Sequence, residues 1–418
     1  MSDNVDYLIV GAGIVGFSIA RELRLREPRA TIRILEKELR PGVHASGRNS
    51  GVLHSGIYYA PGTLKAKLCK AGADAMFAYA EENGVPVRRD GKLIVATSER
   101  NAAGLEALML NARANNIRAS RVTGDDIRRI EPHARSDYGG IHCLDTAVID
   151  SLAVLETLGK QLAQQRVSID VGQALTGIDD AQKSAVAGRR KYSYGLLINA
   201  AGAHADEVAR FADVGRHYQL VPFKGLYHKL SPEAATRVRG SIYPVPNPNL
   251  PFLGIHFTRV INNDVYVGPT AIPALGRENY GVLQGAGPVE ALKIGAQLAR
   301  LYVKNPQNFR SLVHGEIPHY RKARFLATAR ELVDRLEPAW VRPTAKVGIR
   351  PQLLNTQHGR LEMDFVLEEG SNSVHVLNAI SPAFTSAFAF AAWLVDRLPG
   401  SATSSLPDRH HYPQLEAR

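Results

Sequence analysis

Three glycines near the amino terminus have the spacing of a turn that binds phosphate. Gly11, Gly13 and Gly16 form the pattern G-x-G-x-x-G, with Ile14 and Val15 before the third glycine. The first glycine of such a turn permits the tight bend, the second lets the backbone approach a pyrophosphate, and the third lets a helix pack closely on a strand. The N–H groups and the dipole of that helix bind the anion. The spacing therefore predicts a dinucleotide site that includes all five residues.

An acidic residue stands where the ribose of a dinucleotide is expected. Glu36 follows Gly16 by twenty residues, and its carboxylate can accept hydrogen bonds from ribose hydroxyls. Lys37, directly after it, is included in the predicted cofactor site. An acidic residue here disfavours a 2′-phosphate, so NADP is not expected. The glycines and the acidic residue do not by themselves separate NAD from FAD.

The elements around these residues read as a β-α-β unit. Residues 7–10 and 31–35 are short apolar runs of strand type, and residues 14–26 have a helical pattern. Further strands are predicted at 167–171, 194–201 and 373–377, and helices at 152–162, after a cap at Asp150-Ser151, and at 384–398. These segments predict an α/β domain of Rossmann type.

Two segments with a different hydrophobic pattern interrupt that domain. Residues 84–145 and 215–335 hold short alternating runs broken by turns, and 287–303 is a helix candidate. We expect an inserted α+β domain built on a mixed or antiparallel sheet with helices on one side. The predicted division is 1–83, 146–214 and 336–418 for the cofactor-binding domain, and 84–145 with 215–335 for the substrate domain.

Composition excludes several classes of protein. The 418 residues include only two cysteines, which rules out a disulfide scaffold or a cysteine-ligated metal site, and no metal site is predicted. The 51 basic and 40 acidic residues give a net charge of +11, but the basic residues are not interleaved with aromatic ones, so nucleic acid is not an expected partner. The amino terminus has no signal-peptide pattern, and no apolar run is long enough to span a bilayer. The oligomeric state stays unknown.

Residues 47–66, GRNSGVLHSGIYYAPGTLKA, closely resemble a signature of FAD-dependent L-2-hydroxyglutarate dehydrogenases and oxidases. These enzymes belong to the D-amino-acid-oxidase-like flavoprotein superfamily. Further matches cover most of the chain in order, at 242–246, 251–258, 268–271, 277–280 and 377–382. The resemblance implies FAD as the cofactor, bound to a Rossmann-type domain, with a mixed sheet of the substrate domain above the flavin.

The chain departs from the family pattern at three places. The family's Arg-Gly-acidic-Tyr is Lys-Gly-Leu-Tyr at 224–227, and its Gly-Val-Arg-Ala-Gln is Gly-Ile-Arg-Pro-Gln at 348–352, closer to amino-acid oxidases. Phe384 and Phe388 are bulkier than the small residues expected there. A second hypothesis therefore keeps the fold and takes an amine, such as glycine, sarcosine or a D-amino acid, or another 2-hydroxy acid. A non-catalytic dinucleotide-binding protein is a third.

Oxidation of a 2-hydroxy acid needs a base for the hydroxyl proton and cations for the carboxylates. His256 and His54 lie in motifs that the resemblance marks as characteristic, and we favour His256 as the base, with His54 at the flavin ring. Arg350 is the first candidate for a carboxylate anchor. The further substrate-binding candidates are Lys224, Arg259 and Arg277 as cations, and Tyr58, Tyr59 and Tyr243 as lining residues.

The remaining cofactor contacts follow from position in the chain. Arg48, Asn49, Ser50 and Gly51 are expected at the pyrophosphate or the flavin ring, and Val171 at the adenine. The predicted set is completed by Ala201, Gly202, Gly348, Ser381 and Thr385. Ser381 and Thr385 begin the last helix, whose amino terminus can stabilise negative charge on reduced flavin.

These expectations combine into one predicted activity. The chain is expected to oxidise L-2-hydroxyglutarate, a small anionic substrate, to 2-oxoglutarate and to pass the electrons to a quinone or to oxygen. The basic surplus suits an anionic substrate or an anionic lipid surface. The expected location is the cytoplasm, with peripheral contact to the inner face of the cytoplasmic membrane.

Overall fold

The computed structural model describes residues 3–135, 137–247, 252–282, 284–379 and 381–399. Pro251 and Ile380, which belong to motifs quoted above, lie outside these ranges. The outermost ends of the predicted cofactor-binding segments, 1–2 and 400–418, also lie outside them.

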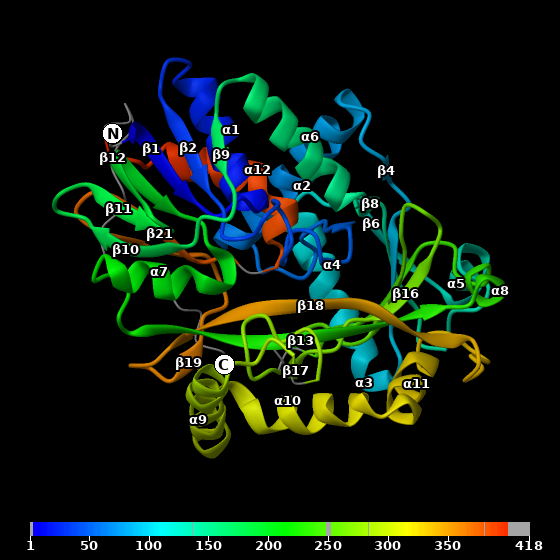
Figure 1. Cartoon of the computed structure of the whole chain (residues 1–418). Coiled ribbons are helices and arrows are strands. Elements are labelled where there is room, and N and C mark those ends of the chain that lie inside the picture. Colours follow the sequence, from blue (N-terminus) through cyan, green and yellow to red (C-terminus); the bar gives the residue numbers. More distant parts are fainter. Residues whose placement is uncertain (1–2, 136, 248–251, 283, 380, 400–418) are drawn as a thin grey trace.

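A parallel sheet carries the phosphate-binding turn (Figure 1). Its strands lie in the order β9, β2, β1, β12 and β21, and every neighbouring pair is parallel. Their bounds are Ser168–Asp170, Ile32–Leu35, Asp3–Val10, Arg190–Asn199 and Ser373–Asn378. The hairpin of β10 (Leu175–Asp179) and β11 (Ser184–Ala187) adds to β12, and β20 (Val366–Glu369) adds to β21, both antiparallel.

Helices cover both faces of this sheet. One face is packed by α1 (Ile14–Arg26), α2 (Leu64–Glu82), α6 (Ser151–Gln164) and α12 (Ala383–Val395), and α7 (Ala205–Phe211) lies on the other (Figure 1). Leu8 and Ile9, adjacent on β1, are therefore both fully buried. Asp150 caps α6 by accepting hydrogen bonds from the N–H groups of Leu152 and Ala153, as predicted.

A larger mixed sheet faces the first one. Its order is β19, β18, β13, β16, β15, β14, β5, β7 and β6, with β17 paired to β13, and only β14 and β5 run parallel. The bounds in that order are Arg360–Leu361, Val341–Asn355, Tyr218–Leu230, Val265–Gly268, His256–Arg259, Ser241–Pro244, Lys92–Val95, Gly140–Cys143 and Ala119–Val122, and β17 is Ile272–Pro273.

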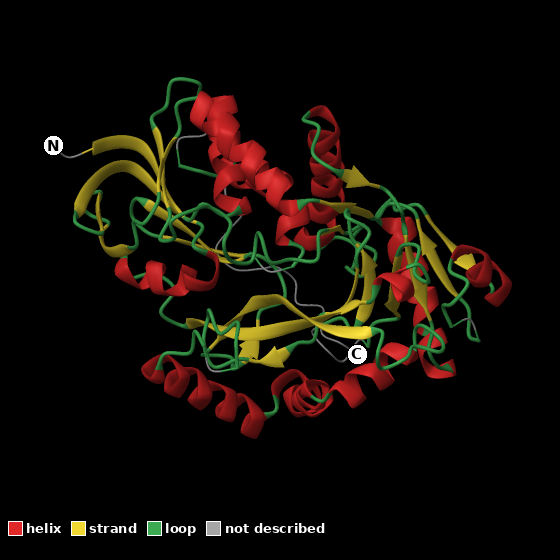
Figure 2. Ribbon diagram, turned by 45° about the vertical axis from the view of Figure 1, so that its right-hand side comes forward, coloured by secondary structure: helices red, strands yellow, loops and turns green. Residues whose placement is uncertain are grey.

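The outer side of the larger sheet is covered by helices α9 (Pro288–Lys304), α10 (Phe309–Glu316) and α11 (Lys322–Arg330), as Figures 1 and 2 show. The remaining helices are α3 (Glu99–Ala102), α4 (Gly104–Ala114), α5 (Gly124–Ile130) and α8 (Pro232–Ala235), and 3₁₀ turns occur at Gly202–His204, Pro306–Asn308 and Ile317–Tyr320. A small sheet joins β3 (Val52–Leu53), β8 (Ala147–Ile149) and β4 (Val87–Arg88). The predicted fold class, a Rossmann-type domain with an inserted α+β part, is confirmed.

One predicted segment joins the other sheet. The sequence assigned 336–418 to the cofactor-binding domain, but β18 pairs with β13 along its length, from Asn355 with Tyr218 to Val341 with Leu230. The long run of inter-strand hydrogen bonds ties β18 and β19 to the larger sheet. None of the helices within the described ranges has the length and apolar character needed to cross a membrane.

Candidate cofactor and substrate site

A cavity of about 750 Å³ is lined by residues of both large sheets. Ligand pockets commonly have volumes of this order. The cavity collects most of the predicted site residues from distant parts of the chain. Those that line it are Gly11, Gly13, Ile14, Val15, Glu36, Lys37, Arg48, Asn49, Ser50, His54, Ala201, Gly202, His256, Arg277, Gly348, Arg350, Ser381 and Thr385.

The glycine turn has no room for side chains. Gly11 has a φ of +107°, and a Cβ there would lie 2.5 Å from the carbonyl oxygen of Ala200. A Cβ on Gly16 would lie 2.0 Å from the carbonyl oxygen of Gly11, so Gly16 acts in packing and does not itself line the cavity. The Ile14 N–H donates to Ser46 Oγ at 2.9 Å at the start of α1. This open helix terminus fits a pyrophosphate.

The Glu36 carboxylate is fixed at the carboxyl end of β2. Its Oε2 accepts from the Ala12 N–H at 2.9 Å and its Oε1 accepts from the Glu38 N–H at 3.0 Å. The side chain is buried at the cavity wall. The carboxylate thus stands beside the phosphate-binding turn, where a ribose would lie.

Besides Gly16, two further predicted cofactor residues do not line the cavity. Val171 is 39% exposed, and the chain turns at Gly172 so that Gln173, Ala174 and Leu175 line the cavity instead. Gly51, with a φ of +72°, bends the chain between two lining residues, Ser50 and Val52. Their positions in the chain were close to the cavity, but the local turns direct them away from it.

His54 and His256 line the same cavity. The His256 Nδ1 lies 2.8 Å from the Gly254 carbonyl, which requires Nδ1 to carry the proton and leaves Nε2 as an acceptor. Burial, followed by the charges of Lys92 and Arg350, lowers the pKa of His256 to about 3. Burial and the charges of Lys92, His256 and Arg350 lower the pKa of His54 to about 3 as well. Both rings are therefore neutral and able to accept a proton.

Arg350 is a cation of the cavity wall that has no acidic partner among the described residues. Its guanidinium lies 4.6 Å from the centre of the Phe252 ring and makes no ion pair with any residue that the structure describes. It lies on β18 directly opposite Phe223 of β13, which also lines the cavity. An unpaired guanidinium facing a cavity suits a carboxylate ligand.

The other three predicted cations are held by protein groups, and two of them lie outside the cavity wall. Lys224 alternates with two lining residues on β13, so it points to the opposite face and donates to Asn279 Oδ1 at 2.9 Å. Arg259 donates to the carbonyls of Ala235 and Val238. Neither lines the cavity. Arg277 does line it, but its guanidinium is held by the two oxygens of Asp206 at 2.6 and 3.0 Å.

The predicted tyrosines form a layer behind the histidine, outside the cavity wall. The Tyr243 ring stacks on His256 with 3.8 Å between ring centres, and neither Tyr243, Tyr58 nor Tyr59 lines the cavity. Tyr58 and Tyr243 enclose the ammonium of Lys92, which lies 4.3 and 4.8 Å from their ring centres. Tyr243 therefore contacts both His256 and Lys92, and Tyr58 contacts Lys92.

Lys92 is a residue that the sequence analysis missed. It is 1% exposed, and its Nζ has no hydrogen-bond partner among the described residues. Burial lowers its pKa to about 8. Strand pairing places it on the same face of the large sheet as Tyr243 and His256. The available signal was a lysine at the first position of the apolar run Lys-Leu-Ile-Val-Ala, where a surface charge is not expected.

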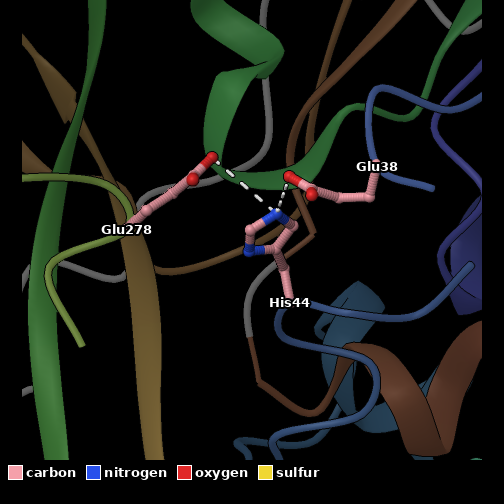
Figure 3. A group of neighbouring side chains, drawn as sticks. All are labelled: Glu38, His44 and Glu278. Atoms are coloured by element: carbon pink, nitrogen blue, oxygen red, sulfur yellow. Dashed lines mark hydrogen bonds and ion pairs between the residues drawn. The ribbon is translucent and has the colours of Figure 1, made fainter. Parts of the chain in front are cut away.

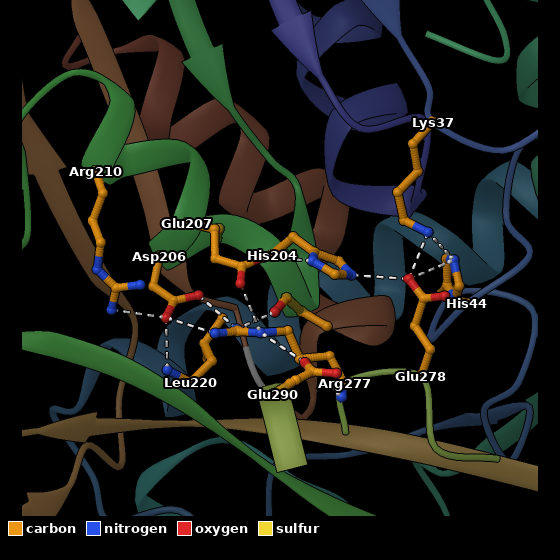
Figure 4. Close-up of polar contacts among 12 residues, drawn as sticks. Lys37, His44, His204, Asp206, Glu207, Arg210, Leu220, Arg277, Glu278 and Glu290 are labelled. Carbon is orange, nitrogen blue, oxygen red and sulfur yellow. Dashed lines mark hydrogen bonds and ion pairs between the residues drawn. The ribbon is translucent and has the colours of Figure 1, made fainter. Parts of the chain in front are cut away.

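An ion-pair cluster joins the two halves of the molecule at the cavity (Figures 3 and 4). His44 Nε2 lies 3.0 Å from Glu38 and 3.7 Å from Glu278, the spacing of a candidate cation site. The Lys37 ammonium lies 2.6 Å from Glu278 and also contacts Glu38, so it already supplies the positive charge. His204 Nε2 completes the cluster at 2.9 Å from Glu278.

The first turn of α12 lines the cavity with Ser381, Phe384 and Thr385. The His54 N–H donates to Thr385 Oγ1 at 3.2 Å, which ties the helix to the loop that carries the histidine. Phe388, one turn later, packs edge-on against Tyr79 and does not line the cavity. Of the two bulky residues that depart from the family pattern, only Phe384 therefore reaches the cavity.

Comparisons with known proteins agree with this architecture. Residues 6–397 match the family model of FAD-dependent oxidoreductases, and the chain belongs to this family. The fold resembles that of L-α-glycerophosphate oxidase from Mycoplasma pneumoniae with FAD bound, with a TM-score of 0.73, 21% identity and coverage of 97% of this chain and 99% of that one. Glycine oxidase from Geobacillus kaustophilus has a TM-score of 0.68 at 16% identity, with 94% of each chain covered.

Closer relatives lie within one branch of that family. The mitochondrial L-2-hydroxyglutarate dehydrogenase of Nematostella vectensis is 34% identical, with 95% of this chain and 91% of the relative covered. The L-2-hydroxyglutarate dehydrogenase of Escherichia coli strain K12 is 32% identical, with 94% and 93% covered. The resemblance found in the sequence is confirmed, and FAD is the cofactor.

Proposed function

We propose that this protein oxidises L-2-hydroxyglutarate to 2-oxoglutarate. The observation that carries the proposal is the pairing, in one cavity with the dinucleotide turn, of two neutral histidines and an arginine without an acidic partner in the described chain. The names of the closer relatives support the same substrate. Bound FAD supplies the oxidant, which accepts a hydride from the α-carbon.

The residues of this chain supply binding and proton transfer. We assign one substrate carboxylate to Arg350 and the hydroxyl proton to His256 Nε2, since Nδ1 is held by the Gly254 carbonyl. The substrate carboxylates oppose the charges of Arg350 and Lys92, which raises the proton affinity of His256 when substrate binds. We assign His54, tied to α12 through Thr385, to the flavin ring.

The amino terminus of α12 gives this site a further electrostatic contribution. The helix begins at Ala383, and its first turn lines the cavity. We propose that its dipole stabilises negative charge at the far end of the cofactor, as the dipole of α1 does at the pyrophosphate.

Anaerobic absorbance spectroscopy tests the substrate. L-2-hydroxyglutarate should bleach the flavin of the purified holoenzyme, whereas the D enantiomer, glycine, sarcosine and D-alanine should not. Bleaching by an amine and not by L-2-hydroxyglutarate would establish the second hypothesis, an amine oxidase on the same fold. That hypothesis rests on the Gly-Ile-Arg-Pro-Gln sequence at 348–352.

The electron acceptor and the domain boundary complete the proposal. We assign the electrons to a quinone or to oxygen, in a protein of the cytoplasm that contacts the inner face of the membrane peripherally.

The pairing of β18 with β13 supports a domain boundary after β19 and not at residue 336. Preferential cleavage near residues 362–365 in limited proteolysis would support this boundary.

A further inference from the structure

Helix α9 has a second apolar face that none of the described parts of the chain covers. Its inner side buries Ile294 and Leu301 against the large sheet. On its outer side Val289, Leu292 and Val303 are 66%, 76% and 71% exposed. Large apolar side chains this exposed are ordinary when scattered, but on one helix face they indicate an interaction surface.

The exposed apolar residues form a continuous stripe. Val289, Leu292, Ala296, Ala299 and Val303 are separated by three, four, three and four residues, and all are exposed. At about 100° per residue, these positions span an arc of about 80° on the helix. We call these five residues the α9 stripe. Val282, in the loop before the helix, is 87% exposed as well.

Basic side chains follow the α9 stripe along one side. Lys293, Arg300 and Lys304 each come one residue after a member of the stripe, and all three are exposed. Residues 288–330 contain eight lysines and arginines but only two acidic residues. Glu290 is 3.4 Å from Arg277, and Glu316 is buried with its carboxylate bound to the Ala271 N–H. The outer side of this segment is therefore cationic.

The position of α9 leaves this face accessible. Figures 1 and 2 show α9, α10 and α11 as the outermost layer of the molecule, on the side of the large sheet that faces away from the parallel sheet. Ile317 and Tyr320, in the 3₁₀ turn of the same layer, are 48% and 51% exposed. The layer thus combines exposed apolar residues with an excess of positive charge.

We infer that the α9 stripe docks this protein on an anionic lipid surface. A helix lying in the membrane interface places apolar side chains at the boundary of the headgroups and acyl chains and basic side chains among anionic headgroups. A two-fold contact between copies of α9 would bring Lys293, Arg300 and Lys304 of one copy toward the same residues of the other. Repulsion between these charges favours the lipid surface over a second copy.

The inference rests on the peripheral membrane contact in the proposed function. Vesicle sedimentation tests it with the holoenzyme and without substrate, so its failure is distinguishable from a failure of the proposed oxidation. We expect binding to vesicles of phosphatidylcholine and phosphatidylglycerol in equal parts, and little binding to phosphatidylcholine alone. Each basic residue near the surface contributes about 1 kcal/mol, or about fivefold. The triple variant Lys293→Gln, Arg300→Gln, Lys304→Gln should therefore bind about a hundredfold more weakly.

Introducing negative charges into the α9 stripe gives the matched test. Leu292→Glu combined with Val289→Glu should weaken vesicle binding about tenfold or more, because two carboxylates replace apolar contact with the membrane. Leu110→Glu on α4 changes a leucine that is 55% exposed on another helix and should bind as the wild type does. All variants should keep the wild-type turnover with a water-soluble electron acceptor.

Two results would overturn the inference. One is equal binding of wild type and the Val289→Glu, Leu292→Glu variant to the anionic vesicles. The other is a wild type that self-associates in analytical ultracentrifugation and does not bind vesicles, together with a stripe variant that is monomeric. That result would assign the α9 stripe to contact between copies of the chain.

Discussion

One backbone carbonyl determines which ring nitrogen of His256 carries the proton. Because Gly254 holds Nδ1, a base at this position can act only through Nε2. His256→Asn should retain bound FAD, judged by the flavin absorbance, and should lower turnover by about 10²–10⁴-fold. The matched variant His54→Asn should change the flavin spectrum more than His256→Asn does. Near-normal turnover of His256→Asn would remove it as the base.

A separate prediction concerns Lys92. A buried ammonium without a hydrogen-bond partner among the described residues destabilises the fold. Lys92→Met should leave the unfolding free energy unchanged or raise it by about 1 kcal/mol. The same change should raise KM for L-2-hydroxyglutarate about tenfold, which corresponds to about 1.4 kcal/mol. Thermal unfolding and steady-state kinetics measure the two effects.

The pKa of Lys92 adds a pH dependence to this prediction. With a pKa of about 8, Lys92 loses its charge as the pH rises through 8, so wild-type KM should rise there and KM of Lys92→Met should not. Lys346→Met is the control, since Lys346 is also a buried lysine over two tyrosine rings, Tyr227 and Tyr266. An identical response in both variants would contradict a special role for Lys92.

Residue types could be predicted from the sequence better than side-chain directions. The glycines, Glu36 and Arg350 were found because a local pattern fixes their surroundings. Lys224 was misassigned, because its direction depends on its alternation along β13, which only the strand register shows. Lys92 was missed since its burial depends on tyrosines that are distant in the sequence.

At the scale of elements, the loop carrying Glu278 is fastened to the loop after β2. Hydrogen bonds from His204 and Lys37 lower the pKa of Glu278 to about 2. Against the effect of burial, hydrogen bonds to Glu207 and Glu278 raise the pKa of His204 to about 9. Glu278→Gln should destabilise the fold by about 1–2 kcal/mol, allowing for solvent screening, and should speed FAD release. Thermal unfolding and flavin fluorescence after dilution measure this.

The hydrogen bonds of His204 to Glu207 and Glu278 predict how the unfolding free energy changes with pH. A histidine whose pKa rises on folding stabilises the fold fully below its unfolded value near 6.5 and loses that contribution as the pH rises through about 9. The unfolding free energy of the wild type should therefore fall between pH 6.5 and 9. The slope should be smaller in Glu278→Gln, and an unchanged slope would exclude His204 as its source.

Elements close to the glycine turn, such as α1 and α6, could be placed from sequence because each has a local period, and α6 also has a capping aspartate. The assignment of β18 could not, since a strand of the pattern found at 341–355 fits either sheet. Its pairing with β13, more than a hundred residues away, decides between them.

At the scale of the whole molecule, bound FAD should stabilise the packing of the two large sheets against each other. The cavity wall includes β1 and α12 from one part and β13 and β18 from the other. A ligand that binds only the folded state stabilises it by about 2.7 kcal/mol at a concentration of 100 times its Kd. Removal of FAD should therefore lower the melting temperature, and added FAD should restore it. Equal melting temperatures with and without FAD would contradict this.

The order of synthesis follows from where the cavity wall comes from in the chain. The glycine turn leaves the ribosome long before β21, at 373–378, and α12, at 383–395. Translation at about 5–20 residues per second separates the two events by about 20–80 seconds. The nascent polypeptide therefore carries an unfinished half-pocket during this interval, and loading with flavin must await the emergence of α12.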